Sequence, residues 1–262
     1  MKKKALLIVF ALVLCLGLAA CGDETDTSPI SDSEIGQLFA SPDDFEGRTF
    51  EFTGRVLQVE KDSDGLAIQA YYDIENYDKN VITYYSDASL KVAEDDFISV
   101  KGTILGEFTG ENAFGGTVSA PMVEAKSVKI VDYQTAVAPA KKELTLTNQT
   151  VEQSGYSVTI DKVEFAESET RVYVTVTNNG SATFSLYAFD AKLVQDGKQI
   201  DAQDNFEAEY PEISSDLKVG ASTSGIVCFP AIDEKDFSLS FSAYSENYEE
   251  TINDFEFNIP VE

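Results

Sequence analysis

The side chains that carry most enzyme chemistry are scarce in this sequence. Its 262 residues contain no histidine and three cysteines, at Cys15, Cys21 and Cys228. Without histidine there can be no Ser-His-Asp triad, no Cys-His pair and no histidine zinc site. The sequence also lacks a phosphate-binding loop and a dinucleotide fingerprint. We therefore expect a protein without catalytic residues and without a cofactor.

Carboxylates are the abundant chemical group: 46 Asp and Glu stand against 19 Lys and Arg, a net charge of −27. Paired acids alone would permit a glycosidase, but the sequence has no tryptophan to stack on a sugar. Asp62, Asp64 and the run Glu94–Asp96 offer hard oxygen ligands for calcium. The first of these segments lacks the closing glutamate of an EF-hand loop, so we favour a turn for the first segment and a solvated helix end for the second. A cation- or small-ligand-binding accessory protein stays open as the alternative function.

The acidic composition also bears on partners. Affinity for DNA and RNA depends on Lys and Arg contacts to phosphate, which this charge balance opposes. Tyr71, Tyr72, Tyr84 and Tyr85 are candidate stacking platforms for bases. Without a basic groove we interpret them as wall and surface of a β domain, and we expect no nucleic-acid partner.

The first cysteines lie in a patterned N-terminal segment. Lys2–Lys4 form a positive stretch, residues 5–18 form an apolar stretch, and "LAAC" ends at Cys21. The apolar stretch has the length of a signal peptide and is short for a membrane span. This arrangement resembles the lipobox of bacterial lipoproteins, although an ordinary secretory signal remains the alternative.

That resemblance implies cleavage before Cys21 and attachment of a diacylglycerol, with palmitate chains, to its sulfur. Residues 1–20 would then be a signal peptide, discarded together with Cys15, and 21–31 a polar tether. The protein would be held at the extracytoplasmic face of the cell membrane by its N-terminal lipid. Its partner would be an unidentified envelope protein or ligand.

Cys228 is the one cysteine in the part that should fold. It lies in "GIVCFP", residues 225–230, which is typical of a buried strand. A single cysteine has no internal disulfide partner, and no histidine is present to activate it. We expect a small buried side chain of the core.

Residues 32–133 begin with a short amphipathic helix and continue as strands. Ile35, Leu38 and Phe39 share one helical face, and Pro42 helps to end the helix. Three strands, a short helix or turn at 88–96 and two further strands follow, with a bend expected at Gly54. This order is that of an OB-fold barrel. The stretches "FTGRV" and "AEDDFISVKGTI" resemble the tRNA-anticodon-binding-like OB family of secreted bacterial proteins.

Residues 134–143, "QTAVAPAKKE", have no periodicity and are interpreted as a linker. From 144 to 262 the sequence is a series of short alternating strands, which indicates a β-sandwich. In one of them Val172, Val174 and Val176 should face inward. Together with the later "KVGASTSGIVCFP", this region resembles the immunoglobulin-like (telokin-like) domains of bacterial lipoproteins, whose function is unknown.

The sequence therefore predicts a mainly β protein with an N-terminal OB-fold barrel and a C-terminal immunoglobulin-like β-sandwich. We expect a lipid-anchored extracytoplasmic binding or scaffolding protein of the bacterial cell envelope, without catalysis. Cys21 is the one residue assigned a chemical role, as the site of lipid attachment.

Overall fold

The computed structural model describes residues 26–111, 117–147 and 149–261. The predicted signal peptide, Cys21 and residues 22–25 of the predicted tether lie outside the described residues. The chain is mainly β, as the sequence predicts, and divides into two compact units at Val131/Asp132. Among the described residues no helix is long and apolar enough to span a membrane.

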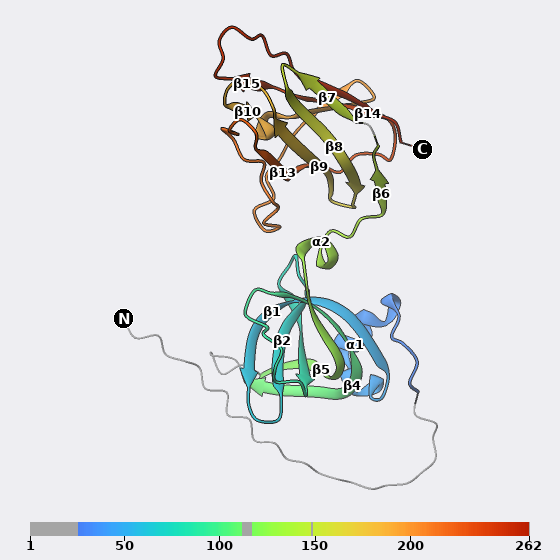
Figure 1. Ribbon diagram of the computed structural model, residues 1–262. Coiled ribbons are helices and arrows are strands. Elements are labelled where there is room, and N and C mark those ends of the chain that lie inside the picture. Colours follow the sequence, from blue (N-terminus) through green and yellow to red (C-terminus); the bar gives the residue numbers. More distant parts are fainter. Residues whose placement is uncertain (1–25, 112–116, 148, 262) are drawn as a thin grey trace, which may run out of the picture. The chain divides into compact units, whose positions relative to one another are not determined.

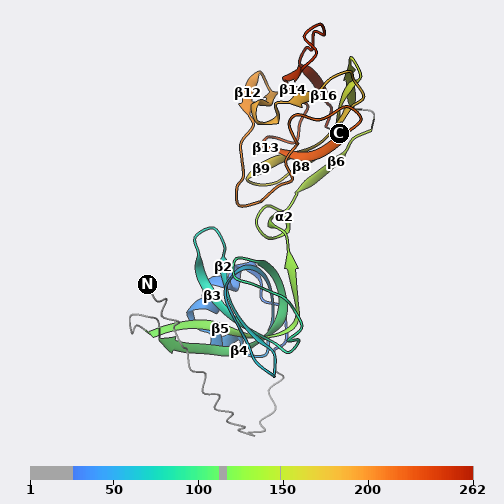
Figure 2. The ribbon, with the colours of Figure 1, turned by 60° about the vertical axis from the view of Figure 1, so that its left-hand side comes forward.

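The first unit is a closed barrel with the strand order β1-β2-β3-β5-β4, seen from two sides in Figure 1 and Figure 2. β3 and β5 pair in parallel, and the other neighbours are antiparallel. The strands are β1 (Thr49–Lys61), β2 (Leu66–Asp73), β3 (Asp78–Tyr85), β4 (Phe97–Glu111) and β5 (Thr117–Val131). Before them come η1 (Asp32–Glu34), α1 (Ile35–Ala40) and η2 (Pro42–Phe45).

The barrel closes because β1 pairs with two neighbouring strands. It pairs with β4 from Thr49 to Arg55 and with β2 from Arg55 to Lys61. A Cβ at Gly54 would lie 2.8 Å from the Tyr71 carbonyl oxygen, so a side chain would not fit beside the neighbouring strand. The register irregularity of β1 lies between Val56 and Gln58, just beyond Gly54, where the bend is predicted. Residues 88–96 contain turns and no helix.

The barrel core explains the predicted amphipathic helix. Leu38 of α1 is fully buried in the same cluster as Phe50, Ile68 and Val100 from the strands. Tyr72, one of the four candidate stacking tyrosines, is half-buried and packs its ring near those of Phe39, Phe50 and Phe52.

The second unit consists of short strands in separate sheets. One sheet has the order β13-β9-β8-β6, with β7 also paired to β8, the second β12-β11-β14-β16, and β10 pairs with β15. The elements are α2 (Tyr133–Ala136), β6 (Lys142–Thr145), β7 (Thr150–Gln153), β8 (Tyr156–Phe165), β9 (Glu169–Asn178), β10 (Phe184–Leu186), η3 (Ala188–Asp190), β11 (Lys192–Gln195), β12 (Lys198–Asp201), β13 (Ser222–Pro230), β14 (Phe237–Phe241), β15 (Ala243–Ser245) and β16 (Phe255–Ile259).

The core of this unit lies between its two larger sheets. Val172, Val174 and Val176 of β9 are buried in one apolar cluster with Leu193 of β11 and Leu239 of β14. This confirms the predicted inward face of β9. Because side chains alternate along a strand, the residues between the valines lie on the outer face of their sheet.

The linker assignment at 134–143 needs correction. Residues 134–136 belong to α2, and Lys142 and Glu143 begin β6. Ala138 is buried, and its carbonyl oxygen accepts a hydrogen bond from Arg171 on β9. Between these elements, residues 137–141 form irregular chain that is bonded to the second unit through the Ala138 carbonyl and through the Lys141 N–H, which donates to the Phe165 carbonyl at 2.7 Å.

Candidate functional site

The outer face of the sheet β13-β9-β8-β6 carries a buried row of polar side chains. Glu164 of β8 stands opposite Arg171 of β9, and Arg171 stands opposite Cys228 of β13. All three are buried, and Cys228 is 4% exposed. Cys228 is thus buried as predicted, but it does not belong to the apolar core. It lies on the opposite face of the sheet from its buried neighbours Val227 and Phe229.

Arg171 is the centre of this polar cluster and is 1% exposed. Its Nε donates to Glu164 Oε2 at 2.8 Å, and its Nη1 donates to Glu169 Oε1 at 2.7 Å. The same Nη1 donates to the Ala138 carbonyl at 2.8 Å. Lys162 Nζ adds a second cation, 2.5 Å from Glu164 Oε1. Two carboxylates thus face two cations, which satisfies the requirement for charge pairing in a buried place.

The pKa directions follow from this pairing. Burial raises the pKa of Glu169, but hydrogen bonds from Tyr210, Arg171 and Asn205 outweigh it and leave this pKa below its usual range. The pKa of Glu164 is also lowered, because hydrogen bonds from Lys162, Arg171 and Tyr173 outweigh burial. Both glutamates are therefore ionised at neutral pH.

The pKa of the Cys228 thiol is shifted in the opposite direction, upward. Burial, followed by the nearby negative charge of Glu169, raises the pKa of its thiol to about 12. The thiol lies 3.3 Å from Glu169 Oε2. Only a thiolate is strongly nucleophilic, so this cysteine is inert at neutral pH.

A long loop, residues 202–216, covers the polar cluster and is fastened to it. Asn205 Nδ2 donates to Glu169 Oε2 at 2.8 Å, and the Tyr210 hydroxyl donates to Glu169 Oε1. The backbone adds bonds from Gln203 N to the Cys228 carbonyl, 2.9 Å, and from Ile226 N to the Pro211 carbonyl, 2.8 Å. The loop is held at several points along its length and is therefore a fixed wall.

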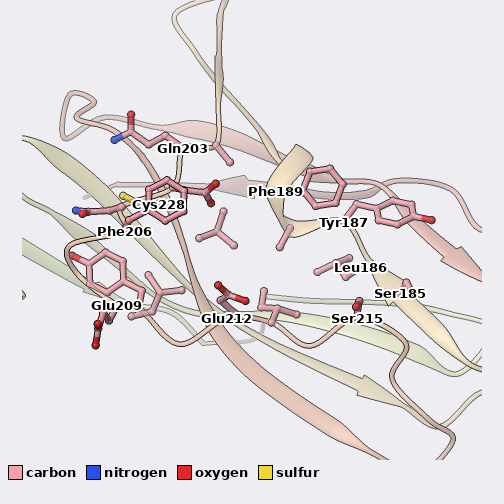
Figure 3. A pocket seen from close by; sticks show the side chains of 18 of the residues that line it. Ser185, Leu186, Tyr187, Phe189, Gln203, Phe206, Glu209, Glu212, Ser215 and Cys228 are labelled. Carbon is pink, nitrogen blue, oxygen red and sulfur yellow. The ribbon is translucent and has the colours of Figure 1, made fainter. Parts of the chain in front are cut away.

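Beside this wall lies a cavity of about 1060 Å³ (Figure 3). The opposite wall is formed by residues 185–189, from the end of β10 into η3, and Figure 3 shows Tyr187 and Phe189 on the other side of the cavity from Phe206. It is lined by Ser185, Leu186, Tyr187, Ala188, Phe189, Ala202, Gln203, Asp204, Asn205, Phe206, Glu209, Tyr210, Glu212, Ile213, Ser215, Asp216, Ile226, Val227, Cys228 and Tyr244. Four of these side chains are carboxylates, and none is Lys or Arg.

Exposed aromatic rings gather at this cavity. Phe189 is 77% exposed and Phe206 85%, and the half-exposed Tyr244 lines the same hollow. Tyr248, 87% exposed, packs its ring against Tyr244 with centroids 6.3 Å apart. Within the described chain, these four are the aromatic residues of the second unit that are classed as exposed rather than buried or partly buried. Such a gathering of apolar rings around a hollow is typical of an interaction site.

The acidic segments considered for calcium have other roles. Asp62 Oδ1 accepts hydrogen bonds from the backbone N–H groups of Asp64 and Gly65, which forms the hairpin turn between β1 and β2. Asp95 Oδ1 lies 3.2 Å from Arg55 Nη2, and Asp96 Oδ2 accepts from the Ala93 N–H. Within the described ranges no group of three or more His, Cys, Asp or Glu side chains is placed to hold a metal ion.

One wall of the cavity has a recognisable sequence pattern, but residue types alone did not identify it as a binding site. The segment 201–212, "DAQDNFEAEYPE", places aromatics among acids without strand alternation. The other wall, residues 185–189, is far away in sequence, so only the fold brings the two together.

Comparison with known proteins gives no family. No family model matches the chain, and no curated protein matches it. The crystal structure of a presumed lipoprotein (ycdA) from Bacillus subtilis superimposes with a TM-score of 0.37 at 17% identity, over 44% of this chain and 39% of that one. A functionally unknown protein from Listeria monocytogenes gives a TM-score of 0.33 at 12% identity, over 48% of this chain and 88% of that one. Likenesses of this strength carry no argument about fold or function.

Proposed function

We propose that this chain is a lipid-anchored, extracytoplasmic binding protein of the bacterial cell envelope that performs no catalysis. The observation that carries the binding role is the cavity of the second unit, with its exposed Phe189 and Phe206 and its fastened loop. A fixed wall reduces the ordering cost of binding. The inert thiol of Cys228 supports a site that holds a partner rather than one that reacts with it.

The finer fold assignments belong to the same proposal. The closed barrel with the order β1-β2-β3-β5-β4 supports an OB-fold in the first unit. In the second unit, two antiparallel sheets around one apolar core support an immunoglobulin-like sandwich.

The anchor is tested by Cys21→Ala. The alanine variant should leave the membrane fraction and lack acyl mass in intact-protein mass spectrometry, because no sulfur remains to carry the diacylglycerol. An alanine variant that stays in the membrane fraction with its acyl mass would refute the anchor.

The binding role is tested by crosslinking in intact cells. A photoreactive phenylalanine analogue in place of Phe206 should give a discrete adduct on illumination. The matched control places the analogue at Val219, which is exposed in the same unit but does not line the cavity. Equal adducts from both positions, or none from Phe206, would contradict a binding role for the cavity.

A further inference from the structure

We infer that the cavity of the second unit takes an extended peptide segment of a partner protein, held by its Arg or Lys side chains. This inference rests on the proposed function, in which the cavity is the binding site, and it adds the chemical class of the ligand.

Charge complementarity is the first argument. The lining carboxylates are Asp204, Glu209, Glu212 and Asp216, and the lining contains no basic side chain. The first three are exposed and form no ion pair within the described part of the chain. Some exposed acids elsewhere in this unit have a local cation, as Asp190 does in Lys192, at 2.8 Å, whereas others, such as Glu152 and Glu256, have no ion pair among the described residues. The cavity differs in that four carboxylates line one hollow without a basic side chain, so its field attracts an incoming cation.

The aromatic walls are the second argument. A guanidinium or ammonium group is attracted to the face of an aromatic ring, and its aliphatic stem packs on the same apolar surface. This chain already uses such contacts: Arg48 lies 5.2 Å from the ring centre of Phe45, and Lys162 lies 4.1 Å from that of Tyr173. Phe189 and Phe206 are exposed rings that line the same cavity as the four carboxylates, so a bound cationic side chain would find both a ring and a counter-charge within it.

The size of the cavity distinguishes a peptide from a small cation. Its volume of about 1060 Å³ lies at the upper limit of the range of sites for small molecules, roughly 300–1,000 Å³. The lining runs from residues 185–189 across to 202–216, with carboxylates distributed along the loop rather than converging on one point. Several spaced charges match several spaced side chains of one chain better than a single ion.

The test is a selection from a library of random dodecapeptides on the full chain in nonionic detergent, at about 150 mM salt to screen long-range attraction. Selected peptides should contain two or more Arg or Lys residues. Their affinity, measured by fluorescence anisotropy, should fall at least about tenfold with Glu209→Gln/Glu212→Gln and with Phe206→Ala. All changed side chains are exposed, so the variants should keep the melting temperature of the wild type.

A matched control removes the same charge elsewhere. Glu152→Gln/Glu256→Gln alters two exposed acids of the same unit that do not line the cavity, and should change affinity less than about twofold. An equal loss with the control pair would show unspecific attraction and overturn the inference. Enriched peptides that lack basic residues but depend on Phe206 would overturn the ligand class and leave the proposed function standing. Failure to enrich any cavity-dependent peptide would overturn both.

Discussion

Replacing Arg171 with methionine tests the account of the buried polar cluster. The variant keeps a side chain of similar length but removes the donors to Glu164, Glu169 and the Ala138 carbonyl. Glu164 still accepts hydrogen bonds from Lys162 and Tyr173. Glu169 still accepts them from Tyr210 and Asn205. Both carboxylates nevertheless lose their ion pair with the guanidinium. Removing one partner of a buried pair costs about 3–5 kcal/mol, so we expect a loss of this size in the free energy of unfolding of the second unit near neutral pH.

The pH dependence of this loss has a definite sign. In the wild type the pKa of Glu169 is lowered, so its contribution is present above the ordinary glutamate pKa and is lost as the pH falls through the lower folded value. Without Arg171, Glu169 loses one of the hydrogen bonds that lower its pKa, while burial still raises that pKa, so the pKa of Glu169 should rise. A contribution from a raised pKa is present at low pH and is lost as the pH rises. The penalty of the variant should therefore be largest near pH 7 and smaller near pH 4, at about the ordinary glutamate pKa.

The assay is urea denaturation followed by circular dichroism at both pH values. Lys235→Met is the control, because Lys235 pairs with Asp233 and Asp196 at the exposed surface, and it should leave the transition unchanged within error. A penalty below about 1 kcal/mol, or one that grows on acidification, would refute the reasoning.

The remaining predictions concern the cysteine and the boundary between the units. Cys228 should resist a thiol reagent at about pH 8 in the native state and react after denaturation, because burial raises its pKa. Tyr210→Phe should accelerate the native reaction, because it removes one of the bonds that hold the loop over the cluster. Rapid labelling of the wild type would contradict the burial. A fragment of residues 132–262 should give a dispersed two-dimensional NMR spectrum, whereas 143–262 should be less stable, because it lacks the carbonyl of Ala138 and the amide of Gln134, which bonds the Tyr173 hydroxyl. Equal melting temperatures for the two fragments would show that these contacts contribute nothing.

Sequence reasoning succeeded where a local pattern determines the structure. Alternation placed Val172, Val174 and Val176 inside, and helical spacing placed Leu38 against the barrel. Each of these signals lies within a few consecutive residues. The mainly β class followed from them.

It was wrong or silent where the answer depends on distant segments. "GIVCFP" is apolar throughout, so it indicates burial of Cys228 without showing which face of the sheet the thiol occupies. That face is polar because Arg171 stands opposite in the neighbouring strand. The cavity likewise needs residues 185–189 and 202–216 side by side, which no local pattern encodes.

The fastened loop has a consequence for how such a protein can diversify. Asn205 and Tyr210 hold the backbone through Glu169, while Phe206, Glu209 and Glu212 project from the same loop without a role in the cluster. Exchanging exposed side chains on a fixed backbone usually changes stability by no more than about 0.5 kcal/mol. The loop thus has some positions that preserve the fold and others that can change which ligand is bound, as an antibody's framework is separate from its binding loops. Libraries randomised at Asp204, Phe206, Glu209 and Glu212 should yield folded variants with new binding specificities.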